Sequence, residues 1–175
     1  MEITLDLALS TILRSMTEVI LPALDSSNKL AQEQSQLVVG LLTLLSNREP
    51  DRLTYTLTEL EHYKDLAVKL NPFWSSDILK SLTATAEELL DKAKGNPDTE
   101  VILNKLRREI ADIAGQVSDG TDKAAREART LILSACSEQQ LRERSWLLMQ
   151  GWETDPSSIP ELSELLRLRQ DDLST

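Results

Sequence analysis

The stretch NPDTEVILNKLRREIADIAGQVSDG, residues 96–120, contains one complete helix signal with a start and a stop. Asn96 can cap the helix, Pro97 suits its first position, and Asp98 places a negative charge at the positive end of the helix dipole. Gly120 marks the end of the segment. Apolar residues recur every three or four positions between these signals: Ile102, Leu106, Ile110, Ile113 and Val117. The stretch therefore predicts an amphipathic helix.

The same periodicity, separated by proline and glycine, recurs in five other long segments. They are 3–24, 28–47, 50–70, 76–94 and 121–150. Ser158 to Glu161 matches a capping box for a short helix over 159–169. Residues 137–140 are expected to bend or break the segment that contains them. The chain has 33 leucines but only one Phe, two Tyr and three Trp, a balance that favours helices over strands.

Six helices of similar length joined by short loops favour an antiparallel arrangement. We therefore predict an all-α fold, a single-domain antiparallel helical bundle of about six long helices plus a short C-terminal helix. The expected division is a bundle over 1–152, followed by an acidic linker and a short amphipathic helix over 153–175. Within 28–47, Gln34 interrupts a leucine-rich stripe that we expect to face the core.

The formal net charge is -10, and the two ends contribute most of it. Phosphate binding needs clustered cations, so we expect no nucleic-acid partner. No apolar run approaches the roughly 20 residues of a membrane span, and the first residues lack the pattern of a signal peptide. A single cysteine, Cys136, cannot form an internal disulfide. These features together predict a cytoplasmic protein.

Residues that usually carry catalysis are scarce: there is one histidine, one cysteine and five glycines. Phosphate-binding glycine loops, nucleophile elbows and Cys-x-x-Cys pairs are all missing from the sequence. We therefore favour a non-catalytic helical interaction or accessory protein that contacts a protein partner or a second copy, with no cofactor or metal. Whether it is an enzyme stays open. Several leucines lie outside any single narrow stripe and suit a wide core or an interface.

Two segments are candidates for contacting a partner. The first is Phe73-Trp74, the only adjacent aromatic pair, in a predicted loop; tryptophan is enriched at binding hot spots. The alternative is that both rings close one end of the bundle, which we favour. The second is the C-terminal helix with Leu162, Leu165 and Leu166, which could enter a groove on another molecule. Docking on its own bundle is the favoured alternative, because a short helix is marginal alone.

Two other functions stay open. A small-molecule binder would use an apolar cavity between helices, with polar groups from Gln34, Tyr55, Tyr63 and Trp146. A carboxylate-rich, metal-dependent enzyme would share Glu59 and His62, which lie three residues apart, across a dimer. No second histidine exists to complete such a site within one chain. Because Leu60, between the two residues, belongs to the apolar stripe, we expect a water-exposed face here, with Lys64 and Asp65 beside it.

Overall fold

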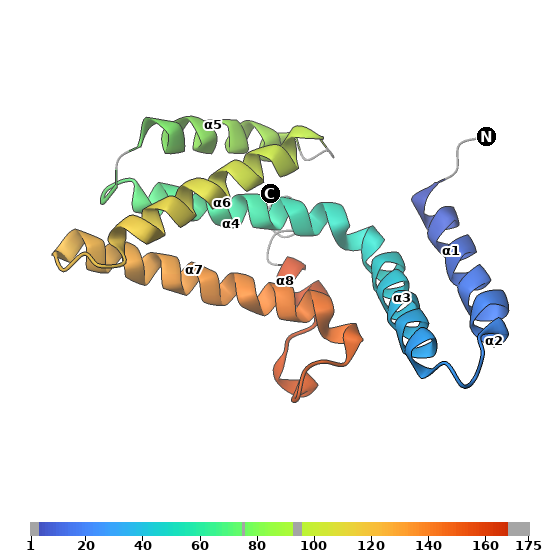
Figure 1. The fold of residues 1–175 in the computed structure, drawn as a ribbon. Coiled ribbons are helices and arrows are strands. Elements are labelled where there is room, and N and C mark those ends of the chain that lie inside the picture. Colours follow the sequence, from blue (N-terminus) through green and yellow to red (C-terminus); the bar gives the residue numbers. More distant parts are fainter. Residues whose placement is uncertain (1–3, 75, 93–95, 168–175) are drawn as a thin grey trace. The chain divides into compact units, whose positions relative to one another are not determined.

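The fold was obtained as a computed structural model, which describes residues 4–74, 76–92 and 96–167 (Figure 1). All regular elements in these ranges are helical, so the predicted all-α class is confirmed. The first long segment combines α1 (Leu5–Ser15), the π-helical turn η1 (Met16–Ile20) and α2 (Leu21–Ala23). The others are α3 (Lys29–Arg48), α4 (Arg52–Leu70), α5 (Asp77–Asp91), α6 (Asp98–Val117) and α7 (Lys123–Leu147). The short α8 (Leu162–Arg167) lies within the predicted C-terminal helix.

Local side chains fix several helix starts. The Thr4 hydroxyl accepts a hydrogen bond from the Leu7 amide at 3.4 Å. The Asn28 side chain accepts one from the Ala31 amide at 3.1 Å, and Ser76 caps α5 in the same way. Each cap satisfies an amide that would otherwise have no partner in the first turn.

Two compact units make up the chain. The smaller contains residues 1–52 and 146–159, and the larger contains residues 53–145 and 160–175. These boundaries differ from the division at 152/153, which stays a prediction about domains. Among the described residues, no helix combines the length and apolar character that crossing a bilayer requires.

The larger unit is built around aliphatic side chains of α4, α5, α6 and α7. The fully buried ones are Leu60, Leu70, Leu79, Leu106 and Val117. Helix α7 contributes Ile132 and three small residues, which allow close packing: Ala125, Ala128 and Ala135. A β-carbon at Gly120 would overlap that of Ala125, so this glycine allows the chain to approach the start of α7. Helix α7 runs without a break, and the expected interruption at 137–140 is wrong.

The smaller unit is a helical hairpin with a few supporting contacts. The segment from α1 to α2 packs against α3. Two side chains bind the segment that follows α7: Arg48 Nε donates to the Trp146 carbonyl at 3.0 Å, and Gln150 Nε2 donates to the Gly40 carbonyl at 3.3 Å. Gly151 reverses the chain with a φ of 69°. The buried hydrophobic side chains described in this unit are few: Leu9, Leu44 and Ile159.

Candidate functional site

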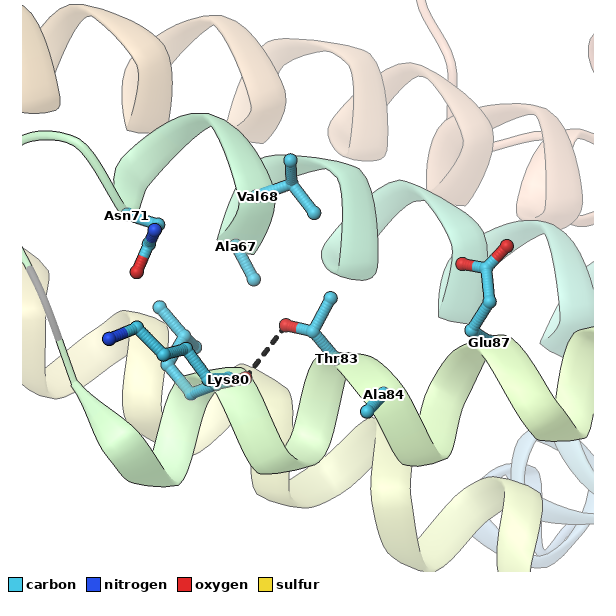
Figure 2. A pocket seen from close by; sticks show the side chains of 8 residues that line it. Ala67, Val68, Asn71, Lys80, Thr83, Ala84 and Glu87 are labelled. Carbon is cyan, nitrogen blue, oxygen red and sulfur yellow. Dashed lines mark hydrogen bonds between the residues drawn. The ribbon is translucent and has the colours of Figure 1, made fainter.

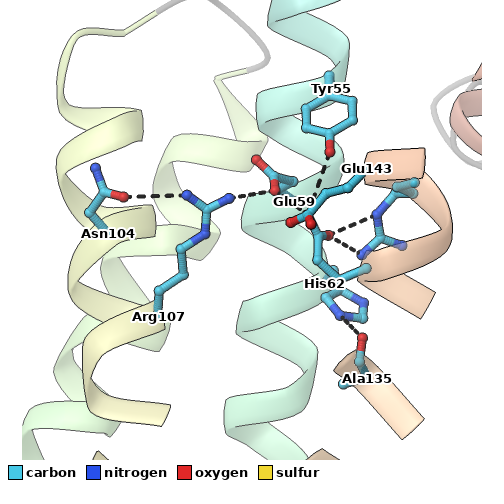
Figure 3. Close-up of polar contacts among 9 residues, drawn as sticks. Tyr55, Glu59, His62, Asn104, Arg107, Ala135 and Glu143 are labelled. Atoms are coloured by element: carbon cyan, nitrogen blue, oxygen red, sulfur yellow. Dashed lines mark hydrogen bonds and ion pairs between the residues drawn. The ribbon is translucent and has the colours of Figure 1, made fainter. Parts of the chain in front are cut away.

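A buried polar network joins α4, α6 and α7 in the larger unit (Figure 3). Glu59, on α4, is only 6% exposed. Its Oε1 accepts hydrogen bonds from Arg107 Nη2 on α6 and from Gln139 Nε2 on α7. The Gln139 Oε1 in turn accepts from Arg142 Nε at 3.1 Å and from Arg142 Nη2 at 2.7 Å. Three helices are therefore connected through one carboxylate and one amide.

The network is crowded with acceptors around one amide. Besides Glu59, Gln139 Nε2 lies 3.1 Å from Glu143 Oε1 and 3.5 Å from the Tyr55 hydroxyl. Burial raises the pKa of Glu59, although the Arg107 charge opposes that shift. Burial and the nearby Glu59 carboxylate raise the pKa of Tyr55 to about 12. These groups bind one another, as expected of a satisfied structural network in a helical core.

His62 faces α7 from the next turn of α4. Its Nε2 lies 3.0 Å from the Ala135 carbonyl oxygen, and its Nδ1 lies 3.6 Å from Glu138 Oε2. Burial lowers the pKa of His62, with the Arg142 charge acting in the same direction. The expectation that Glu59 and His62 lie on a water-exposed face is therefore wrong, because this face of α4 packs against other helices. No cluster of three metal-ligating side chains occurs among the described residues.

The four residues predicted to line a ligand cavity are divided between the two units. Tyr55 and Tyr63 lie beside the network of the larger unit, where the Arg107 guanidinium stands 5.4 Å from the Tyr63 ring centre. Gln34 and Trp146 belong to the smaller unit. Gln34 is exposed rather than core-facing, which corrects the sequence-based expectation. The four side chains therefore line no common cavity of either unit.

The candidate partner-contact residues are mostly used within the chain. Phe73 and Trp74 are half-buried and pack against the core of the larger unit. Leu162 and Leu166 are buried, and Leu165 is half-buried. The Ser145 hydroxyl donates to the carbonyl of Pro160, just before α8, at 2.8 Å. The C-terminal segment therefore docks on its own unit.

A groove between α4 and α5 was not anticipated from the sequence. Its volume is about 350 Å³, and Figure 2 shows its lining side chains. Asn71 and Lys80 lie at one end and Glu87 at the other. The remaining lining residues are small or apolar: Ala67, Val68, Leu79, Thr83 and Ala84. Periodicity identifies apolar faces, but it does not reveal where small residues leave space between two helices.

The smaller unit exposes most of the chain's large apolar surface. Of the eighteen large hydrophobic side chains that are exposed in the described residues, thirteen belong to this unit. Five of them form one face of α3, here named the leucine stripe: Leu30, Leu37, Val38, Leu41 and Leu45. The sequence placed these five residues on one core-facing stripe together with Gln34 and Leu44; of the seven, Leu44 is buried and the other six are exposed.

Comparison with known proteins found no matching family model, no similar curated protein and no similar solved structure. The function must therefore be inferred from the surfaces and side chains of the chain itself. Three features are available for that inference: the leucine stripe, the α4–α5 groove and the buried polar network.

Proposed function

We propose that this protein is a non-catalytic interaction protein, and that its N-terminal hairpin associates with a second copy of the chain through the leucine stripe. The observation that carries the proposal is the exposure of that stripe, whose five side chains are each between 44% and 67% exposed. Contiguous apolar surface of this kind is typical of protein–protein contact sites.

The stripe is separate from the face of α3 that packs within the hairpin. Its residues follow spacings of seven, one, three and four positions, so they share one side of the helix. One line of half-buried positions lies about 100° around the helix: Ala31, Ser35, Val39, Leu42 and Ser46. The buried Leu44 borders the stripe on its other side, next to Leu37. Helix α3 packs against α1 within the hairpin, and the five stripe side chains stay exposed in that packing. The apolar stripe is therefore left for another molecule.

Charge supports a second copy as the occupant. Helix α3 has no charged residue from Gln34 to Asn47, although the whole chain carries -10. Two copies that met through the acidic ends of the chain would bring like charges together, whereas two copies of this face would not. A two-fold interface places the same patch on both partners, so an uncharged, apolar face suits it. Two hairpins with helices of similar length would form a four-helix bundle.

The available surface is sufficient for a stable pair. The same hairpin offers further exposed apolar side chains for such a contact: Leu5 and Ile12 on α1 and Val19 on η1. Eight half-exposed side chains per copy give sixteen in the pair, each contributing about 0.8–1.5 kcal/mol when buried. The gross gain is about 13–24 kcal/mol, and its midpoint exceeds the midpoint of the association cost, about 4–15 kcal/mol, by about 8–9 kcal/mol. A remainder of about 8 kcal/mol corresponds to a dissociation constant of about 1 µM.

Sedimentation velocity across a dilution series tests the proposal. We expect a dimer near 10 µM, about tenfold above the dissociation constant, and a monomer at nanomolar concentration. The double variant L37E/L41E should be monomeric throughout, because it buries four carboxylates at the interface. The matched control L133E changes an exposed leucine of the larger unit and should stay dimeric.

Circular dichroism of each variant is the control for folding, and we expect helix content equal to that of the wild-type protein. A wild-type protein that is monomeric at about 100 µM would refute self-association. It would leave a larger protein partner as the occupant of the stripe. A control L133E that dissociates as readily as L37E/L41E would refute the assignment of the interface to α3.

A further inference from the structure

The α4–α5 groove contains a buried acceptor that lacks a partner within the described part of the chain. Asn71 directly follows the last residue of α4, and its Oδ1 is buried without a hydrogen bond. Figure 2 shows this oxygen turned toward α5. Buried polar atoms in native proteins are almost always hydrogen-bonded, and this oxygen lacks such a donor. Because Asn71 lines the groove, a small rotation of its side chain would present the oxygen to a ligand donor there.

The body of the groove suits a small apolar group. Ala67 is almost fully buried and forms part of the floor, and Ala84 and Thr83 line the opposite side from α5. The Thr83 hydroxyl donates its hydrogen to the Leu79 carbonyl of its own helix at 2.7 Å. The volume of about 350 Å³ falls in the range of small-molecule sites. A branched aliphatic side chain would fit between these walls.

The charges of the groove are arranged asymmetrically. At one end, the Lys80 ammonium lies 3.6 Å from Asp77 Oδ1, too far for a direct hydrogen bond. At the other end, Lys64 binds the Glu87 carboxylate at 2.7 Å. Lys64 also lies 3.5 Å from Asp65. The Lys80 end is therefore the end that can accept an anion, and it is the end where Asn71 stands.

We propose that the α4–α5 groove binds an apolar α-amino-acid carboxylate, either free or at the C-terminus of a peptide. The carboxylate would bind Lys80 Nζ, the adjacent N–H would donate to Asn71 Oδ1, and the aliphatic side chain would occupy the groove. This ligand has an anion next to a donor, which matches the juxtaposition of the two side chains. The proposal concerns the larger unit and does not depend on self-association.

Four related probes test the proposal, titrated into the isotope-labelled full-length protein and followed by NMR. N-acetyl-L-leucine represents a peptide C-terminus, and L-leucine represents the free amino acid. L-leucinamide lacks the carboxylate, and 4-methyl-2-oxopentanoate lacks the N–H donor. We expect at least one of the first two to bind with a Kd of about 1 mM or tighter and to shift the Asn71 side-chain amide. Both analogues should bind at least fivefold more weakly.

Variants separate this site from non-specific binding. K80Q should weaken the preferred probe at least fivefold, whereas the control K92Q changes an exposed lysine outside the groove and should not. A84L fills the groove from an exposed position and should abolish binding. Preference for the acetylated probe would identify a peptide C-terminus as the source, and preference for leucine the free amino acid.

Three results would overturn the proposal. The first is that no probe produces saturable shifts up to about 10 mM, tenfold above the expected Kd. The second is equal binding by K80Q and K92Q. The third is unchanged binding by A84L in a variant whose spectrum shows that it is folded.

Discussion

Removal of the Glu59 carboxylate should separate the structural contribution of the polar network from that of simple packing. We compare Glu59→Ala, which removes both acceptors and side-chain volume, with Glu59→Gln, which keeps an acceptor of similar shape. Breaking a fully buried ion pair by deleting one partner costs about 3–5 kcal/mol. That range is the starting point for the alanine variant.

Two features of the structure reduce that cost. The Arg107 side chain is 36% exposed, so water can solvate its charge after the carboxylate is lost. Gln139 keeps Glu143 and Tyr55 as neighbours. We therefore expect Glu59→Ala to lower the free energy of unfolding by about 2–4 kcal/mol. We expect Glu59→Gln to change it by less than about 1 kcal/mol, since burial raises the pKa of Glu59 and so opposes its charged form.

The assay must report on the larger unit. Trp74 belongs to that unit, whereas Trp146 and Trp152 belong to the smaller one. Urea unfolding in a W146F/W152F background, followed by Trp74 fluorescence, therefore measures the relevant transition. Thermal midpoints should fall by about 4–16 °C for the alanine variant, at about 2–4 °C per kcal/mol. A cost below about 1 kcal/mol for alanine, or equal costs for both variants, would refute the reasoning.

Three further predictions concern other positions. Burial lowers the pKa of His62 in the folded state, so between the folded pKa and pH 6.5 the unfolded chain binds a proton that the folded chain does not. The contribution of neutral His62 to the free energy of unfolding should therefore be fully present above pH 6.5 and be lost as the pH falls toward the folded pKa. Urea unfolding at several pH values should show a flatter acid limb for H62Q, and an unchanged limb would contradict this assignment. Gly115 lies within α6 with open space around an added β-carbon, so G115A should raise the free energy of unfolding by about 0.5–1 kcal/mol. G120A should lower it by about 1–3 kcal/mol, because its β-carbon would overlap that of Ala125. Equal thermal midpoints for the two variants would exclude this contrast. Gln34 is exposed on α3 between Leu30 and Leu37 of the leucine stripe. Q34L should therefore tighten the proposed dimer about tenfold in a sedimentation dilution series, for a gain of about 1–2 kcal/mol. Weaker association of Q34L would place Gln34 outside the contact.

The helices could be predicted because their signals are local. A cap, a proline at the first turn and an apolar period of three to four residues all lie within a few positions of each other. The structure accordingly ends α4 at Leu70, as predicted, and begins α6 at Asp98, one residue after the predicted first position, Pro97. The uninterrupted α7 was missed because polar residues at 137–140 suggested a surface break. Gln139 is instead buried, with partners on α4.

The candidate sites could not be predicted equally well, because they depend on distant residues. Glu59 meets Arg107, 48 positions away, and Gln139, 80 positions away. The α4–α5 groove likewise depends on how far two helices stand apart, which small residues such as Ala67 permit but do not specify. Asn71 carried no signal in the sequence beyond its position after a helix.

The sequence by itself determined that the chain forms six long helices and a short one, and which face of each helix is apolar. Only the tertiary structure decided which faces are covered. Glu59 and His62 were expected in water and are packed against other helices, whereas the leucine stripe of α3 was expected in the core and is exposed. The physical reason is that helical periodicity records a preference for burial, while burial itself requires a second surface, which a distant part of the chain or another molecule supplies.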